Sequence, residues 1–276
     1  MEDENSSQAE SEPAPDHEHD SEHPLCAIAP LTDEPSVSDR FATPETNWQS
    51  VLRKFLIFEF AMVPIAILLI YLFGLPQAGN IAGQLFGEDS WISGLVFGML
   101  ATVPLLSLFV LSELFGSYWK PFRELRNLVF TKLMPMMRGI PSWGLLLISL
   151  GAGFGEEWFF RGFLQQLVKF WLGADAGIWP AVLIVSLLFG ACHALSKTYF
   201  LLTFIIGIYF GYLVELTGSV LPAALSHAGY DFVALIYLMT LDNQLRQQER
   251  KEVLEDGEGP ADSTSVEDLE KESTNQ

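Results

Sequence analysis

The middle of the chain consists of long apolar stretches that are separated by short polar segments. A helix rises about 1.5 Å per residue, so about 20 apolar residues are needed to cross a hydrocarbon layer of ~30 Å. Six stretches approach or exceed this length, and they cover approximately residues 50–73, 91–117, 143–171, 178–196, 199–217 and 219–241. We therefore expect an all-α fold, a polytopic helical membrane protein with about six transmembrane helices.

The two ends of the chain differ from this middle in their charge. The 276 residues include 34 Asp and Glu residues and 15 Lys and Arg residues, which gives a formal net charge of −19. Residues 1–50 contain 13 acidic residues and one basic residue, and residues 242–276 contain 11 acidic and four basic residues. Both ends have few apolar side chains to bury, so we predict disordered acidic tails over residues 1–47 and 242–276.

This distribution excludes several classes of protein. There is no basic face to which nucleic acid would bind. The two cysteines, Cys26 and Cys192, cannot form a disulfide scaffold or a cysteine-based zinc site. Lys and Arg residues are found in every second loop, and six helices with both termini in the cytoplasm account for this pattern. In a bacterium, the membrane would be the plasma or inner membrane.

Residues 120–138 form the most basic of the connecting segments. Five Lys and Arg residues alternate there with Phe, Leu, Val and Met. This alternation suits a helix that lies at the boundary with the cytoplasmic head groups. A positively charged loop that only fixes the topology accounts for the same pattern.

Three pairs of glycines are spaced four residues apart inside the predicted helices. The pairs are Gly94 with Gly98, Gly151 with Gly155, and Gly207 with Gly211. Small residues at this spacing let two helix backbones approach closely, so we interpret the pairs as packing surfaces.

Six ionisable side chains fall inside three of the predicted helices. They are Glu156, Glu157, Arg161, His193, His227 and Asp231. An ionisable residue in the middle of a bilayer costs roughly 2.5–3.5 kcal/mol on insertion scales. A shared polar site inside the membrane is the simplest explanation for six such residues.

Helix geometry divides these residues into pairs. Glu157 and Arg161 are four residues apart, so they lie on one face of a helix and can pair. Glu156 lies on a different face and is the carboxylate left over, which suits a base that acts on water. His227 and Asp231 are also four residues apart, so Asp231 can orient the His227 ring, or help to bind water, a metal or an oxyanion.

Glu156, His193 and His227 would converge from three helices. Two histidines and a glutamate form either a zinc site with an activated water or a metal-free glutamate–histidine site. The predicted depths disagree, because His193 lies about 5 Å from the end of its helix and the other two lie about 20 Å from theirs. Either the fourth helix continues past Leu195, or the third helix is broken near residues 151–155.

Three further acidic residues, Glu59, Glu113 and Glu215, lie inside predicted helices. None of them forms a motif with a neighbour, so we interpret all three as structural. Nothing in the sequence explains Glu59.

The ordered combination of motifs resembles the CPBP family of intramembrane proteases, which includes the CAAX prenyl endopeptidases and many bacterial Abi proteins. The matching motifs are E-E-W-F-F-R at Glu156, Glu157 and Arg161, F-G-A-C-H at Phe189 and His193, and H-A-G-Y-D at His227 and Asp231. These motifs fall within residues 143–241, which would form the protease core. Residues 48–142 would supply two N-terminal transmembrane helices and the basic cytoplasmic loop.

This resemblance implies a hydrolase that cleaves a peptide bond within the membrane, among membrane lipids. Its substrate would be a peptide or a membrane protein, and a C-terminal peptide is one option. If these positions have the same roles as in the family, Glu156 would activate the water together with His193. Glu157, Arg161 and Phe189 would support them.

The resemblance also implies that His227 and Asp231 support an oxyanion or complete a metal site. If Zn²⁺ is the cofactor, its ligands would be Glu156, His193 and His227. The last motif position is often Asn in the family, and an ionised Asp cannot donate a hydrogen bond to an oxyanion. Asp231 must then be protonated, bind metal or orient His227.

Two other functions remain open. A non-catalytic membrane scaffold would recruit soluble partners through the acidic tails and would retain a vestigial site. A small transporter would use Glu156 and His227 as a proton relay, although inverted repeats and matched broken helices are not evident in the sequence.

Overall fold

The computed structural model of the protein describes residues 47–87, 91–116 and 118–257. Within these ranges the chain is helical and contains no strand, so the predicted all-α fold is confirmed. The elements are α2 (Trp48–Leu72), η1 (Pro76–Gly79), α3 (Ile81–Phe86), α4 (Trp91–Gly116), α5 (Lys120–Leu128), η2 (Val129–Leu133), α6 (Met134–Met137), α7 (Ser142–Glu157), η3 (Trp158–Leu164), α8 (Gln165–Leu172), η4 (Ala174–Ala176), α9 (Trp179–Cys192), α10 (Lys197–Thr217) and α11 (Leu221–Gly257).

The number of helices that can span a membrane is smaller than six. In the described part of the chain, four helices are long and apolar enough, and they are Trp48–Leu72, Ile81–Gly116, Lys197–Thr217 and Leu221–Glu252. The segments Lys120–Met137 and Ser142–Leu172, bent by 112°, add a fifth span if the pair is counted as one. The fourth predicted span is absent from both sets, because α9 has only 14 residues. The count of six is therefore not confirmed.

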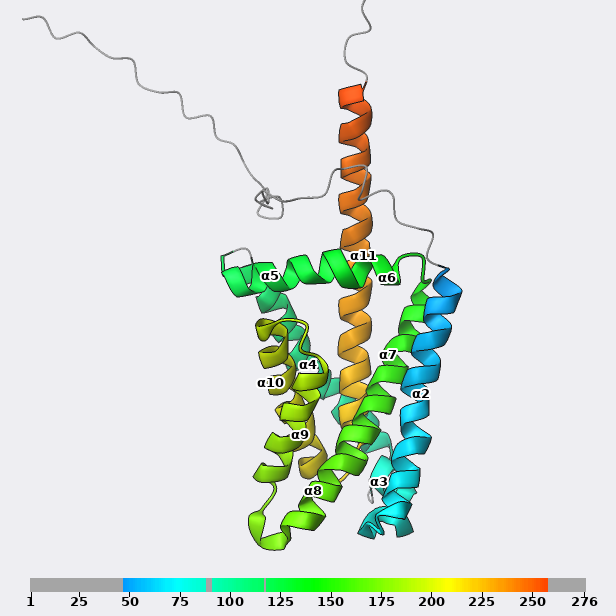
Figure 1. The fold of residues 1–276 in the computed structure, drawn as a ribbon, viewed down its shortest axis with the longest axis vertical. Coiled ribbons are helices and arrows are strands. Elements are labelled where there is room, and N and C mark those ends of the chain that lie inside the picture. The colour runs from blue at the N-terminus through cyan, green and yellow to red at the C-terminus, as the bar shows by residue number, and fades with distance from the viewer. Residues whose placement is uncertain (1–46, 88–90, 117, 258–276) are drawn as a thin grey trace, which may run out of the picture. The chain divides into compact units, whose positions relative to one another are not determined.

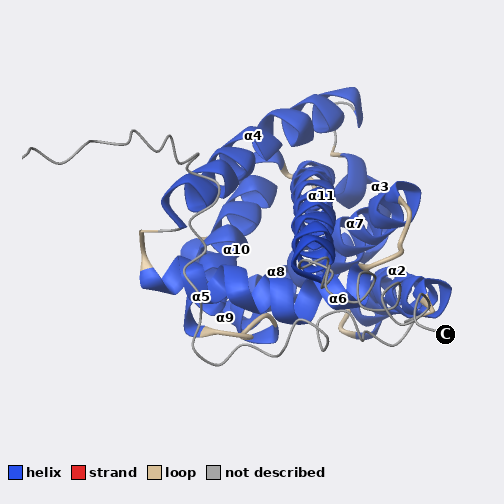
Figure 2. Ribbon diagram, turned by 90° about the horizontal axis from the view of Figure 1, so that it is seen from above, coloured by secondary structure: helices blue, strands red, loops and turns tan. Residues whose placement is uncertain are grey.

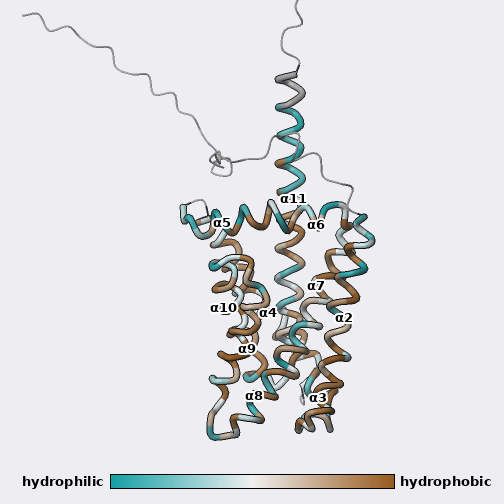
Figure 3. The backbone as a smooth tube through the Cα atoms, in the orientation of Figure 1, coloured by the Kyte–Doolittle hydropathy of each residue, from teal (hydrophilic) through white to brown (hydrophobic). Residues whose placement is uncertain are grey.

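The apolar side chains of these helices also cover the outside of the bundle. Large hydrophobic side chains such as Leu72, Met99 and Leu100 are more than 60% exposed. Figure 3 shows hydrophobic residues along the helices of the bundle, and hydrophilic residues on α5, α6 and the part of α11 beyond them. A surface of this kind is stable in lipid and not in water, so the protein is a multi-pass membrane protein.

The segment from α5 to α6 lies across one end of the bundle (Figure 1). It is helical along its length, with a wider turn at η2. This arrangement favours a surface helix over an irregular connecting loop. Its position relative to the lipid head groups stays a prediction.

The predicted C-terminal tail is wrong for residues 242–257, because α11 continues without a break to Gly257. Gln, Glu, Lys and Arg dominate this stretch, and all four residue types favour helix even where no apolar face can be buried. Asp242 is buried, and its carboxylate accepts hydrogen bonds of 2.9 and 2.8 Å from the Arg138 guanidinium. The other parts of the predicted tails, residues 1–46 and 258–276, lie outside the described residues.

Helix α11 stands among the other helices and packs against α4, α7 and α10 (Figure 2). Glycines make the closest contacts, as the sequence predicted. On α4, Gly94 and Gly98 face Leu221 and Leu225 of α11, and on α10 Gly207 and Gly211 face Ser186 and Val182 of α9. The packing interpretation of the glycine pairs is confirmed for both helices.

Helix α7 is packed closely on two sides. Gly151 and Gly155 face Glu59 of α2, and Gly153 faces the backbone of Ala224 and the Cβ atom of Ala228 on α11. The helix runs unbroken through all three glycines to Glu157. One of the two explanations for the difference in depth, a break near residues 151–155, is therefore wrong.

The other explanation is also wrong, because α9 does not continue past Leu195 but ends at Cys192. Its 14 residues rise only about 21 Å. Figure 1 shows α9 and α10 below the end of the bundle that α5 and α6 cover. The end of α9 is nevertheless level with the end of α7, because Nε2 of His193 lies 3.7 Å from Oε2 of Glu156.

We predict that Gly155→Ala lowers the free energy of unfolding by about 1–3 kcal/mol, because the added Cβ would overlap the backbone oxygen of Glu59. Thermal unfolding in detergent micelles, followed by circular dichroism, measures this loss. Gly79→Ala is the matched control, since no atom lies within 4 Å of the Cβ that it would add. Equal melting temperatures for both variants would contradict the close packing of α2 on α7.

Candidate active site

The ionisable residues of the three motifs lie together where α7, α9 and α11 meet. Nε2 of His193 is 3.7 Å from Oε2 of Glu156. Nδ1 of His227 is 3.0 Å from Oε1 of Glu157, and its Nε2 is 3.5 Å from Oδ2 of Asp231. The predicted convergence of three helices on one polar site is what the structure contains.

His193 caps the C-terminal end of α9, and its ring is held by the helix itself. Nδ1 lies 2.8 Å from the backbone oxygen of Phe189, one turn earlier. A carbonyl oxygen only accepts hydrogen bonds, so Nδ1 donates this one. In the neutral ring, Nε2 then has the free lone pair, and it is Nε2 that faces Glu156.

His227 is held between two carboxyl groups and two aromatic rings. The Glu157 and Asp231 contacts engage one ring nitrogen each. The imidazole stacks on Phe210 with the ring centroids 5.0 Å apart, and Phe189 meets it edge-on at 6.1 Å. These contacts leave the ring little freedom to turn.

The Glu157–Arg161 pair forms as predicted and is fully buried. Arg161 Nη1 donates to Glu157 Oε1 at 3.1 Å, and both side chains have no exposed surface. Arg161 Nη2 also donates to the backbone oxygen of Gly207 at 3.0 Å, and the guanidinium lies 4.4 Å from the centroid of the Phe189 ring. The pair therefore joins α7 to α9 and α10, and Glu157 extends it to α11.

The third predicted span departs from a regular α-helix at η3. There the backbone forms a wider, π-type turn from Trp158 to Leu164, which contains Arg161. Such a turn leaves a carbonyl group without its usual helical partner. The Gly162 carbonyl instead accepts hydrogen bonds from the side chains of Gln77 and Gln84, on the segment before α4.

The motif residues differ in the exposed fraction of their side chains. The side chains of Asp231, His193 and Glu156 are 29%, 25% and 13% exposed, whereas those of Glu157 and Arg161 are sealed. Asp231 and His193 are therefore the more open side of the cluster, and Glu157 and Arg161 are its closed side.

The donors do not fit a resident zinc ion. Both ring nitrogens of His227 face carboxyl oxygens, and Nδ1 of His193 is bonded to a carbonyl. No three His, Cys, Asp or Glu side chains within the described ranges are arranged to hold a metal ion.

Two of the three remaining acidic residues have clear structural partners. Glu215 pairs with Lys169 at 2.6 Å and accepts a hydrogen bond from Gln165. Glu113 pairs with Arg126 at 3.5 Å. Their structural interpretation is confirmed, and Glu59 is the exception.

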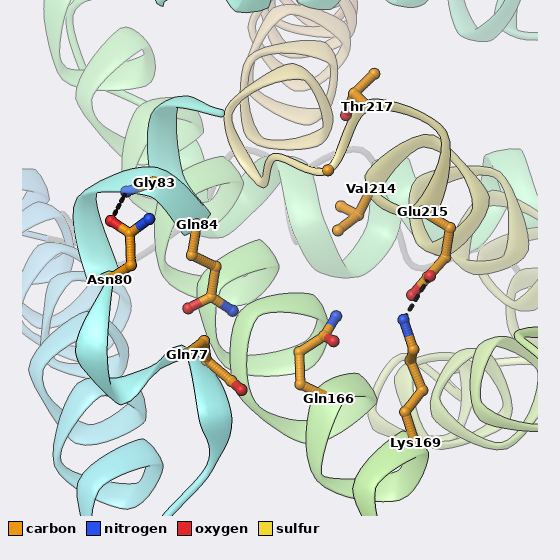
Figure 4. Close-up of a pocket in the computed structure, with 10 residues that line it drawn as sticks. Gln77, Asn80, Gly83, Gln84, Gln166, Lys169, Val214, Glu215 and Thr217 are labelled. Atoms are coloured by element: carbon orange, nitrogen blue, oxygen red, sulfur yellow. Dashed lines mark hydrogen bonds and ion pairs between the residues drawn. The ribbon is translucent and has the colours of Figure 1, made fainter. Parts of the chain in front are cut away.

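A separate polar pocket lies at the other end of the bundle (Figure 4). Its volume is about 470 Å³, and the side chains of Gln77, Gln84 and Gln166 line it beside the Lys169–Glu215 pair. It contains none of the motif residues. The side-chain nitrogens of Gln77 and Gln84 donate to the Gly162 carbonyl, and Oε1 of Gln84 is buried without a hydrogen-bond partner in the described part of the chain.

The fold and the site define a multi-pass helical membrane protein with an ionisable cluster inside the bundle. Residues 138–233 match a family model described as type II CAAX prenyl endopeptidase Rce1-like. This range contains all three motifs, and it supports the assignment of the chain to the CPBP/CAAX protease family. No curated protein and no solved structure matches the chain significantly.

At the level of the family, this match supports a CAAX-protease-like intramembrane endopeptidase, and such a family implies a peptide or protein substrate in the membrane. Residues before 138, including α2 and α4, lie outside the match.

We predict that Arg161→Met destabilises the protein by about 3–5 kcal/mol, because it leaves the buried Glu157 carboxylate without its cation. The double variant Glu157→Gln with Arg161→Met should recover part of this loss, since it buries no unpaired charge. Unfolding in denaturant, in micelles, measures both. A double variant as unstable as the single one would show that the charge on Glu157 is not the cause.

Proposed function

We propose that the chain hydrolyses a peptide bond with a water molecule that Glu156 and His193 activate. The observation that supports this proposal is the 3.7 Å contact between Oε2 of Glu156 and Nε2 of His193. Both atoms accept hydrogen bonds, so one water can donate to each of them. A general base within reach of its water, directly or through one hydrogen bond, is the requirement for this chemistry.

In the proposed reaction, the water oxygen attacks the peptide carbonyl carbon while Glu156 accepts a proton from the water. The carbonyl oxygen becomes an oxyanion in the tetrahedral intermediate. Glu156 then gives the proton to the amide nitrogen, the C–N bond breaks, and an amine and a carboxylic acid leave. The reaction balances in protons and electrons, and no step of it requires a metal ion.

His227 is the proposed donor to the oxyanion. Glu157 holds its Nδ1 side, so Nε2 is the nitrogen next to the accessible Asp231. We assign to Asp231 the orientation of this ring. This role does not require Asp231 to donate a hydrogen bond itself, which accommodates Asp where the family often has Asn.

The substrate class follows from the family. The matched description names CAAX prenyl endopeptidases, so a C-terminal peptide is the first substrate to test. Nothing in the cluster indicates that a prenyl group is required.

We also propose that the end of the bundle covered by α5 and α6 faces the cytoplasm. The basic residues of this segment lie there, and α2 begins and α11 emerges at the same end (Figure 1). Lys and Arg in short loops favour the cytoplasmic side, so both chain ends would be cytoplasmic.

We predict that Glu156→Gln and His193→Ala each reduce turnover of a peptide by the purified protein at least 100-fold, the lower range for a lost general base. The measurement is cleavage of a quenched fluorescent C-terminal peptide in micelles or proteoliposomes. Glu113→Gln is the matched control, because it neutralises a membrane carboxyl that pairs with Arg126 instead. Unchanged turnover in both site variants would eliminate the mechanism.

Chelation provides an independent check. We expect turnover to be unchanged after the protein is incubated with a chelator and freed of metal, because no three His, Cys, Asp or Glu side chains in the described ranges are arranged to hold a metal ion. Metal analysis of the same sample confirms the removal. Activity that is lost and then restored by added Zn²⁺ would contradict the metal-free reaction.

A further inference from the structure

Glu59 is a buried acidic residue in the middle of α2. Only 6% of its surface is exposed. A Cβ atom added to Gly155 would overlap the backbone oxygen of Glu59. A Cβ atom added to Gly151 would lie 3.0 Å from the Cβ atom of Glu59. The glycines of α7 therefore bring Glu59 against the turn that precedes Glu156.

Helices α2 and α11 both pack against α7, and this arrangement places Glu59 on the side of the active site. Leu52, Phe55 and Leu56 of α2 share one apolar cluster with Leu235 and Met239 of α11. The two helices run in opposite directions (Figure 1). One turn beyond this cluster, α2 presents Glu59 and α11 presents Asp231.

Electrostatic interactions agree with this placement. The Glu59 carboxyl group interacts with His227 and with Asp231. Glu156 in turn interacts with Glu59 and with the same two residues. Glu59 thus belongs to the cluster, although it lies far outside the matched residues 138–233.

Unlike Glu113 and Glu215, Glu59 has no ion-pair partner within the described part of the chain. Its Oε2 atom is buried and has no hydrogen-bond partner within the described part of the chain. Glu113 and Glu215 are bonded to Arg126 and Lys169. A buried polar atom without a partner marks a place where a water or a ligand group is missing.

The charges of the cluster are unbalanced. Arg161 compensates Glu157, which leaves Glu59, Glu156 and Asp231 beside two histidines. The proposed reaction assigns roles to Glu156 and Asp231 but none to Glu59. A carboxylate in a buried site is costly unless a cation pairs with it.

We propose that Glu59 binds a positively charged group of the substrate, so that the protein prefers peptides with Lys or Arg close to the scissile bond. The location of this cation site rests on the proposed hydrolysis. The binding test of the site does not require that hydrolysis occurs. Glu59 is a specificity-determining residue that α2 contributes to a site built mainly by α7, α9 and α11.

The experiment compares two peptides that differ at one position, Lys against norleucine, which has a chain of similar length without the charge. We expect the wild-type protein to cleave the Lys peptide with a kcat/KM roughly 10- to 100-fold higher, as for a hydrogen-bonded charged pair. Glu59→Gln should remove this preference, because it lowers kcat/KM for the Lys peptide far more than for the norleucine peptide. Glu59→Asp, which retains the charge, should keep part of the preference.

Glu113→Gln is the control, and it should keep the full preference. A merely structural Glu59 would lower kcat/KM for both peptides together, and that result overturns the inference. Equal cleavage of the two peptides by the wild-type protein overturns it as well, even if Glu59→Gln fails to fold.

Binding of the same labelled peptides, measured by fluorescence polarisation, separates this inference from the proposed function. If no peptide is cleaved, the proposed hydrolysis fails, but a tighter Kd for the Lys peptide that Glu59→Gln abolishes would still support the cation site. An identical Kd for both peptides on the wild-type protein would overturn the cation site whether or not cleavage occurs.

Discussion

The active-site helices depend on one buried ion pair, Glu157 with Arg161. Glu157 also holds His227 of α11, and Arg161 bonds the Gly207 carbonyl of α10 and lies over the Phe189 ring of α9. A buried charge is tolerated only when its partners are in place, so four helices must meet correctly before either charge is satisfied. The pair therefore couples the folding of the bundle to the geometry of the reacting residues.

Glycine lets these helices come close enough for the pair to form. Gly151, Gly153 and Gly155 give α7 two smooth sides, one against α2 and one against α11. Glycine costs roughly 1 kcal/mol in a helix in water, but in lipid close backbone packing offsets this cost. The same contacts bring acidic side chains from α2 and α7 into one region, which larger residues would keep apart.

The short helix α9 explains how water can be used within the bundle. Because α9 ends at Cys192, its last carbonyl groups and His193 lie at a helix end beside Glu156 of α7. Non-helical backbone at membrane depth is stable only where it lines a protected or water-filled space. The Phe189 carbonyl that would need such a partner is bonded by the His193 ring, so the end of the helix also orients the proposed catalytic histidine.

The sequence by itself determined the helical class and the contacts within single helices. Apolar stretch length predicted the helices, and a spacing of four residues predicted Glu157 beside Arg161 and His227 beside Asp231, because a helix places such residues on one face. For contacts between helices, the sequence predicted only that Glu156, His193 and His227 converge from three helices. The tertiary structure decided that α9 ends at Cys192, that α11 extends to Gly257, and that Glu59 packs against Gly151 and Gly155 of α7. These features depend on where helices end and which faces they bury against each other, and the periodicity of one segment contains no information about its neighbours.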